Sequence, residues 1–198
     1  MRPVPAASVL RAPLALCAAL VALAPAGCVR SRREVMLIVT TNIACPTIDR
    51  ITVRISRGAG STAYTWQRTF ALTGEGCSTT SNVGMPVIPL STRADYRLGI
   101  VDSLRTDERV RIEVEGLGLS GVRSVAETDF VDDKVYAVPV DLSLQCQNYE
   151  PCASGFVCRV PPGTAQAACG SIYRTPGTLG TFTVPMAITA HDTVEMGP

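Results

Sequence analysis

Strict alternation of apolar and polar residues is the feature that most restricts the fold of this chain. Residues 50–57 read RITVRISR and residues 109–115 read RVRIEVE, so every second residue is apolar. A period of two residues is typical of a β-strand with one face in a core and the other in water. No stretch of about ten residues shows a helical period. The sequence therefore predicts an all-β fold.

Further runs extend this pattern over residues 35–145. Three groups are each expected to share one strand face: Tyr64, Trp66, Phe70 and Leu72; Tyr96, Leu98 and Ile100; and Tyr136, Val138, Val140, Leu142 and Leu144. Residues 35–41 are apolar on both faces, which favours a more central strand. About eight strands at this spacing predict an antiparallel β-sandwich of immunoglobulin-like or transthyretin-like type.

The first 27 residues have the composition of a secretory signal peptide. A start containing Arg2 and Arg11 leads into the apolar run 12–24, and small residues follow. This run is too short to span a bilayer, which needs about 20 apolar residues. Ala26-Gly27-Cys28 resembles the lipobox of bacterial lipoproteins, although Pro25 stands where that family usually has leucine.

The lipobox resemblance implies that the chain is cut before Cys28, that diacylglycerol is attached to its sulfur, and that the new N-terminus is acylated, for example with palmitate. Val29 follows Cys28 where an aspartate would resemble an inner-membrane retention signal, so the resemblance implies the outer membrane. The alternative is ordinary secretion, with Cys28 left as a free thiol.

The eight cysteines divide into groups. Cys17 lies in the signal peptide and Cys28 is the predicted lipid-attachment residue. The six others are predicted to form disulfides, because an exported chain meets an oxidising compartment. They are Cys45, Cys77, Cys146, Cys152, Cys158 and Cys169. We expect one bridge between Cys45 and Cys77, and we take crossed pairing of Cys146 with Cys158 and Cys152 with Cys169 as a working hypothesis.

Charge and histidine content restrict the function. Lys+Arg number 18 against 17 Asp+Glu, which argues against a nucleic-acid partner. A single histidine, His191, leaves little room for a histidine-based triad or a multi-histidine zinc site. The four cysteines from Cys146 to Cys169 also lack the closely spaced pairs of a structural zinc site. No cofactor, metal or catalytic residue is predicted.

Three motifs could carry chemistry, and each has a simpler interpretation. The glycines of Gly116–Gly121 match a dinucleotide-binding pattern, but a strand follows them instead of a helix, so we expect a hairpin loop with glycines at positive φ. Asp129, Asp132 and Asp133 are a weak calcium candidate, because they lack the D-x-D-x-D-G spacing. Trp66 could stack on a sugar, but its place in an alternating strand favours core packing.

The layout resembles that of a group of uncharacterised surface lipoproteins from myxobacteria and related delta-proteobacteria. They share a lipobox cysteine, an opening strand like residues 36–41, a strand like 51–53, and a long strand like 138–146 that leads into a cysteine-rich segment. The group has no established activity. The resemblance implies a cell-envelope location, with the membrane as partner through the lipid anchor.

The predicted organisation is a signal peptide (1–27), a lipidated tether (28–34), a β-sandwich (35–145), a cysteine-rich segment (146–170) and a C-terminal strand or tail (171–198), with one strand expected over 181–188. We expect a non-enzymatic structural or binding module whose partner is an envelope protein or a surface glycan. The loops 74–86 and 103–108 are the expected contact surfaces. The alternatives are an envelope enzyme that acts through carboxylates, for example on glycans, and a secreted, unlipidated binding protein.

Overall fold

The structure is a computed structural model of the 198-residue chain. It describes residues 33–73, 77, 87–89, 96–102, 108–118, 121–181 and 192–196. The chain separates into two compact units, Met1–Ser31 and Arg32–Pro198, and every described residue belongs to the second. Within these ranges no helix has the length and hydropathy needed to cross a membrane. Cys28 and the predicted signal peptide lie outside the described residues.

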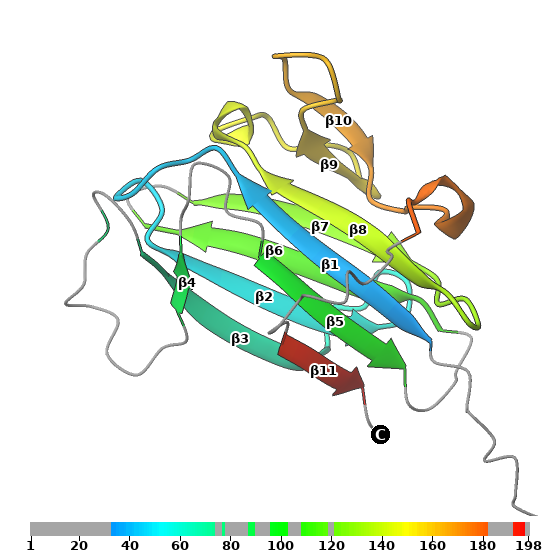
Figure 1. Ribbon diagram of the computed structural model, residues 1–198. Coiled ribbons are helices and arrows are strands. Elements are labelled where there is room, and N and C mark those ends of the chain that lie inside the picture. The colour runs from blue at the N-terminus through cyan, green and yellow to red at the C-terminus, as the bar shows by residue number, and fades with distance from the viewer. Residues whose placement is uncertain are drawn as a thin grey trace, which may run out of the picture. The chain divides into compact units, whose positions relative to one another are not determined.

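The first sheet has four strands in the order β11-β5-β1-β8 (Figure 1). They are β1 (Glu34–Thr41), β5 (Tyr96–Asp102), β8 (Val135–Leu142) and β11 (Asp192–Met196). β1 lies between β5 and β8, which is the inner position that its two apolar faces predict.

The second sheet has five strands in the order β4-β3-β2-β6-β7. They are β2 (Arg50–Arg57), β3 (Tyr64–Thr73), β4 (Val87–Pro89), β6 (Val110–Leu117) and β7 (Val122–Thr128). β2 pairs antiparallel with β3 and with β6, and β6 pairs antiparallel with β7. Three pairs in the two sheets are parallel: β1 with β8, β5 with β11, and β3 with β4.

One apolar core lies between the two sheets, and Figure 1 shows them as two layers. Ile51, Val53 and Ile55 of β2 are buried there, as alternation predicts, and so are Val110, Ile112 and Val114 of β6. Leu98 and Ile100 of β5 and Val138, Val140 and Leu142 of β8 face them from the other sheet. The predicted all-β sandwich is confirmed, whereas its immunoglobulin-like or transthyretin-like type stays a prediction.

The chain after β8 includes the predicted disulfide-rich segment (146–170) and the residues on either side of it, and we call residues 144–178 together the cysteine-rich segment. It contains a 3₁₀ turn (η1, Leu144–Cys146), an antiparallel pair made of β9 (Phe156–Arg159) and β10 (Ala168–Ser171), and a second 3₁₀ turn (η2, Pro176–Thr178). Disulfides join Cys146 to Cys158 and Cys152 to Cys169, in the crossed arrangement of our working hypothesis, and a third joins Cys45 to Cys77.

One expectation about a strand end is wrong, and another falls on residues that the structure does not describe. Leu144 does not continue the buried face of β8, because the strand ends at Leu142 and Leu144 is exposed in η1. The C-terminal edge strand is β11, which pairs with β5 over residues 192–196. Of the expected strand 181–188, only Thr181 is described, and it makes an isolated bridge to Tyr136.

The glycine-rich sequence at residues 116–121 joins β6 to β7 as a hairpin, as expected, but for a different reason. Its described glycines, Gly116, Gly118 and Gly121, do not have a positive φ. Gly118 instead lies against the backbone of the segment before β2. A Cβ atom on it would lie 2.5 Å from the carbonyl oxygen of Thr47 and 2.8 Å from Cα of Ile48. Close approach of two backbones, rather than a left-handed turn, explains this glycine.

Candidate functional site

The outer face of the five-stranded sheet carries a network of charged side chains. The register of the strands places Arg54 of β2 opposite Glu113 of β6, and Glu115 of β6 opposite Arg123 of β7. Arg111 of β6 lies opposite Glu127 in the same way. Because these positions alternate with the core residues, their side chains leave the sheet on the side away from the core. Arginines and glutamates on neighbouring strands therefore meet.

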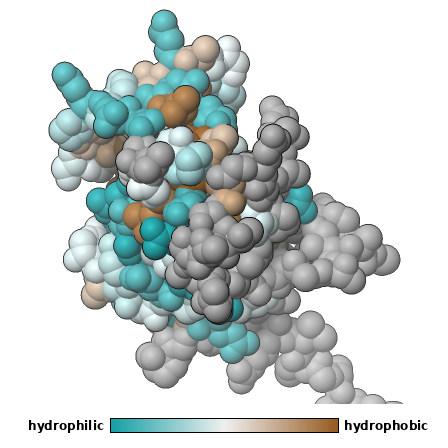
Figure 2. Space-filling view, turned by 90° about the vertical axis from the view of Figure 1, so that its left-hand side faces the viewer, coloured by the Kyte–Doolittle hydropathy of each residue, from teal (hydrophilic) through white to brown (hydrophobic). Residues whose placement is uncertain are grey.

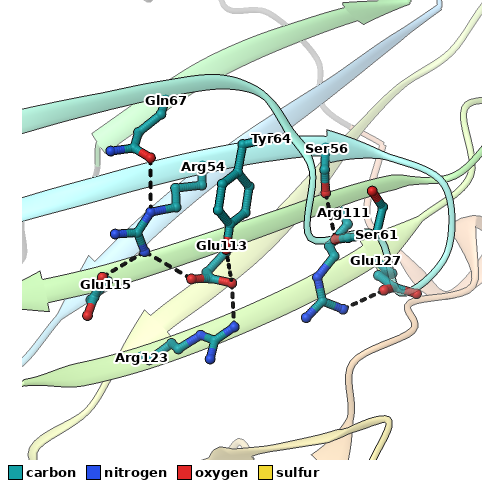
Figure 3. Close-up of polar contacts among 10 residues, drawn as sticks. All are labelled: Arg54, Ser56, Ser61, Tyr64, Gln67, Arg111, Glu113, Glu115, Arg123 and Glu127. Carbon is teal, nitrogen blue, oxygen red and sulfur yellow. Dashed lines mark hydrogen bonds and ion pairs between the residues drawn. The ribbon is translucent and has the colours of Figure 1, made fainter.

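Glu113 is the centre of this network (Figure 3). Its carboxylate accepts hydrogen bonds from Arg54 Nη1 at 2.9 Å, from the Tyr64 hydroxyl at 3.1 Å and from Arg123 Nη2 at 2.5 Å. The side chain is only 4% exposed. Burial alone would raise the pKa of Glu113, but the hydrogen bond and charge of Arg123, together with the bonds from Tyr64 and Arg54, hold this pKa below its usual value.

Arg54 links this centre to both neighbouring strands. Its Nη1 also donates to Glu115 Oε2 at 2.7 Å, and its Nε donates to Gln67 Oε1 of β3 at 3.2 Å. Burial lowers the pKa of Arg54, but the bonds to Glu115 and Glu113 outweigh it, so the guanidinium remains charged. The network therefore spans β3, β2, β6 and β7 (Figure 3).

Tyr64 reaches the network because of a β-bulge. The pairing of β2 with β3 shifts between Ile55 and Ser56, so that Ile55 lies opposite Trp66 while Ser56 lies opposite Tyr64. One extra residue in β3 reverses the side-chain alternation beyond that point. The prediction that Tyr64 shares the core face with Trp66 and Phe70 is therefore wrong. Trp66 packs against the core, whereas Tyr64 is 40% exposed and its hydroxyl binds Glu113.

A groove of about 580 Å³ lies between this face and the cysteine-rich segment. Its polar side is formed by Arg111, Arg123 and Glu127, and its floor includes Val125. Arg111 Nη1 donates to Glu127 Oε1 at 2.6 Å, and the backbone N–H of Gly60 donates to the same oxygen at 2.9 Å. Figure 3 shows this ion pair beside the Glu113 network.

The opposite wall of the groove comes from the segment that contains the disulfides. It consists of Ser154, Gly155, Phe156, Val157 and Ile172. Phe156 is 51% exposed, which is unusual for a phenylalanine and gives the groove an apolar rim. Figure 2 shows hydrophobic patches set among hydrophilic residues in the upper part of one side of the molecule.

Backbone hydrogen bonds attach the cysteine-rich segment to the edge of β7. The N–H of Glu127 donates to the carbonyl of Ile172 at 2.8 Å, and the N–H of Arg174 donates to the carbonyl of Glu127 at 2.7 Å. Thr128 Oγ1 donates to the carbonyl of Arg174 as well. These bonds hold the two walls of the groove at a fixed separation.

A side-chain cluster at the end of β7 adds to this attachment. Asp129 accepts a hydrogen bond from the Tyr173 hydroxyl at 2.5 Å and another from Arg109 Nε at 3.1 Å. The Arg109 guanidinium carbon lies 4.1 Å from the centre of the Tyr173 ring. The bond to Asp129, with burial, raises the pKa of Tyr173, so its hydroxyl remains a donor.

Two of the three carboxylates considered for calcium are engaged by arginines. Asp129 binds Arg109, and Asp132 accepts a hydrogen bond from Arg33 Nε at 2.6 Å. Over the described ranges, no group of three His, Cys, Asp or Glu side chains is placed to hold a metal ion. His191 and nearly all residues of the loops 74–86 and 103–108 lie outside the described residues.

The groove was not predicted from the sequence. Its polar wall could have been found from the alternating charges of 109–115, which indicate an outward face. The other wall could not, because Phe156 and Ile172 are brought to the sheet by the disulfide-bonded shape of their segment and by its hydrogen bonds to the end of β7. Comparisons of the chain with protein-family models, with curated proteins and with solved structures find no match.

Proposed function

We propose that this protein is an exported cell-envelope lipoprotein, anchored through Cys28 in the bacterial outer membrane, which acts as a non-enzymatic binding module. One observation carries the proposal. All six cysteines that follow Cys28 are joined in disulfides within the fold. Disulfides persist in oxidising compartments such as the periplasm and the cell surface. Cys28 is the additional cysteine, and it stands directly after a sequence with the composition of a signal peptide.

Lipid chains on Cys28 would hold the protein at the membrane. Each buried methylene group of an acyl chain contributes about 0.8 kcal/mol, and one chain alone gives only reversible binding. The lipobox pathway adds two or three chains, which makes the anchoring stable. Residues 29–32 then separate the anchor from Arg33, the first residue that the structure describes.

The groove favours binding over acid–base catalysis. A glycosidase needs one carboxyl group that is protonated near neutral pH. The pKa of Glu113 is lowered, and this carboxylate already accepts bonds from Arg54, Tyr64 and Arg123. Glu127 is held by Arg111 and Gly60. Both buried carboxylates therefore hold arginines in place at the groove, and this fixed arrangement suits binding of an envelope protein or a surface glycan.

The anchor is tested by growing a Gram-negative host that expresses the full chain with radiolabelled palmitate, followed by membrane fractionation. We expect wild type to carry label and to sediment with membranes, and Cys28→Ala to lose both properties. Val29→Ala, which leaves Gly27-Cys28 intact, serves as the matched control and should behave as wild type. Membrane retention of unlabelled Cys28→Ala protein would contradict anchoring at this residue.

Mass spectrometry of the purified chain distinguishes the secreted alternative. A lipidated protein begins at Cys28 and carries the added acyl mass. An unmodified N-terminus before Cys28 would instead support a secreted, unlipidated protein. Alkylation under denaturing, non-reducing conditions should leave the six paired cysteines unmodified, and alkylation of any of them would argue against an oxidising compartment.

A further inference from the structure

Two arginines in the groove carry hydrogen-bond donors beyond those that the fold uses. Arg111 gives Nη1 to Glu127, but its Nε is buried without a partner in the described structure. Arg123 gives Nη2 to Glu113, and its side chain is 54% exposed. A guanidinium has five N–H donors in a planar fork that matches a carboxylate. Both side chains line the groove, and an anionic group can reach them through the exposed Arg123 guanidinium and the 13% of the Arg111 side chain that is accessible, whereas the buried Nε of Arg111 faces no solvent.

The strand register sets how far apart these arginines lie. Arg111 is opposite Glu127, and Arg123 is four residues before Glu127 on β7. At about 3.3 Å per residue, the two positions are separated by about 13 Å along the sheet. Val125 lies between them on the floor of the groove. This is the separation of the two backbone positions; the Arg123 side chain reaches toward Glu113, which lies opposite Val125, so its guanidinium leans toward Arg111. A ligand that meets both arginines therefore spans Val125 and the neighbouring part of the groove.

The opposite wall offers an apolar surface to the same ligand. Phe156 stands half-exposed at the rim, and Val157 and Ile172 continue the wall inward. A sugar ring has one face made largely of C–H groups, which packs well on an aromatic ring. The groove therefore combines carboxylate-binding forks on one side with a stacking surface on the other.

The backbone of the groove is poorly suited to an extended peptide. Peptides that bind a sheet edge need free main-chain donors and acceptors. Here the N–H and carbonyl of Glu127 are bonded to Ile172 and Arg174, and the carbonyl of Gly155 is bonded to Ile172. The N–H of Phe156 is bonded to Ala153. Recognition in this groove must come mainly from side chains, which favours a saccharide over a peptide strand.

We propose that the groove binds an acidic oligosaccharide, whose uronate carboxylates pair with Arg111 and Arg123 while one sugar ring lies against Phe156. The inference rests on the proposed function, since it names the surface glycan that a membrane-anchored binding module would hold. Glu127 fixes Arg111 in place, and Glu113 fixes Arg123, so the two forks are positioned before the ligand arrives.

Titration calorimetry of the full lipidated protein in detergent tests the proposal. The probe is a tetrasaccharide of galacturonic acid, and the matched control probe is the same tetrasaccharide with its carboxyl groups reduced to alcohols. We expect saturable binding of the acid, binding at least tenfold weaker for the neutral form, and weaker binding at higher salt because exposed charges are screened. A tetraglutamate peptide is the third probe, because it carries carboxylates on a peptide backbone instead of on sugars.

Three variants locate the site. Arg123→Gln and Phe156→Ala change exposed side chains and should each weaken binding about tenfold, which corresponds to about 1.4 kcal/mol. Arg50→Gln, which removes an arginine that does not line the groove, should leave binding unchanged. Far-ultraviolet circular dichroism of each variant confirms that the fold is retained.

Several outcomes would overturn the inference. They are the absence of saturable binding at millimolar probe, equal binding of the reduced tetrasaccharide, equal binding by Arg123→Gln, and tighter binding of tetraglutamate. None of them affects palmitate labelling at Cys28. If labelling succeeds and binding fails, the saccharide ligand is wrong while the anchored lipoprotein stands. If labelling fails, the proposed function itself is wrong.

Discussion

Removing the Cys45–Cys77 disulfide should lower the free energy of unfolding more than removing either of the other two disulfides. The two cysteines are separated by 32 residues, and the loop-closure relation gives about 4 kcal/mol for a bridge of that span. A domain of this size is stable by about 5–15 kcal/mol in total. We therefore expect the double variant Cys45→Ala/Cys77→Ala to lose a large fraction of its free energy of unfolding.

Trp66 provides the readout. It is the only tryptophan, and it packs against the core, so its fluorescence follows unfolding of the sandwich. Guanidinium titration of the full chain gives the free energy of unfolding and the slope m, which reports the surface exposed. The matched control is Cys152→Ala/Cys169→Ala, whose separation of 17 residues gives about 3 kcal/mol by the same relation.

The two variants should differ by more than the loop lengths imply. The Cys45–Cys77 bridge packs against the sandwich core, whereas the Cys152–Cys169 bridge lies within the cysteine-rich segment. We expect the control variant to lower the free energy of unfolding, measured from Trp66 fluorescence, by less than half as much as Cys45→Ala/Cys77→Ala does. A loss below about 1 kcal/mol for Cys45→Ala/Cys77→Ala, against the predicted 4, or equal losses for both variants, would refute the reasoning.

Two further substitutions test the charged network and the hairpin. Glu113→Gln should lower the free energy of unfolding at pH 7 by about 1.5–3 kcal/mol, because the hydrogen bonds from Arg54, Tyr64 and Arg123 lose their charged acceptor. The folded-state pKa of Glu113 is lowered, so the stabilisation by its carboxylate is fully present above the pKa of an unfolded glutamate, about 4.3, and is lost as pH falls through the lower folded value. Denaturation at pH 7 and at pH 3 should therefore show that the difference in free energy of unfolding between wild type and Glu113→Gln shrinks in acid. A difference that stays constant would contradict the assignment. Gly118→Ala should cost about 1–3 kcal/mol, because the new Cβ would press on the carbonyl of Thr47, while Gly177→Ala, with open space around it, serves as control and should be close to neutral by thermal unfolding.

Much of the sandwich follows from local pattern. Alternation in β2 and β6 reports which residues face a core, because side-chain direction in a strand has a period of two wherever the pairing is regular. The same logic fails at Tyr64, where one bulged residue between Ile55 and Ser56 moves the side chain to the opposite face. A bulge depends on the neighbouring strand, so the sequence of β3 alone contains no sign of it.

The order of strands depends on contacts between distant segments. β1 pairs in parallel with β8 although about a hundred residues separate them, and Thr40 donates to Asp141 across this pair at 3.0 Å. Burial raises the pKa of Asp141, and that hydrogen bond only partly opposes it. Neither the parallel pairing nor the environment of this carboxyl group can be obtained from residues 34–41 or 135–142 taken separately.

The fold class and the outward charged face could be predicted from alternation along single strands, because both depend on residues that are close along the chain. The even number of exported cysteines was enough to predict disulfides. The groove, by contrast, exists only in the folded chain. Arg111, Arg123 and Phe156 come together only when the disulfide-bonded segment is bonded to the edge of β7 through Glu127. Long-range hydrogen bonds and disulfides fix that arrangement, and their geometry exists only in the folded chain.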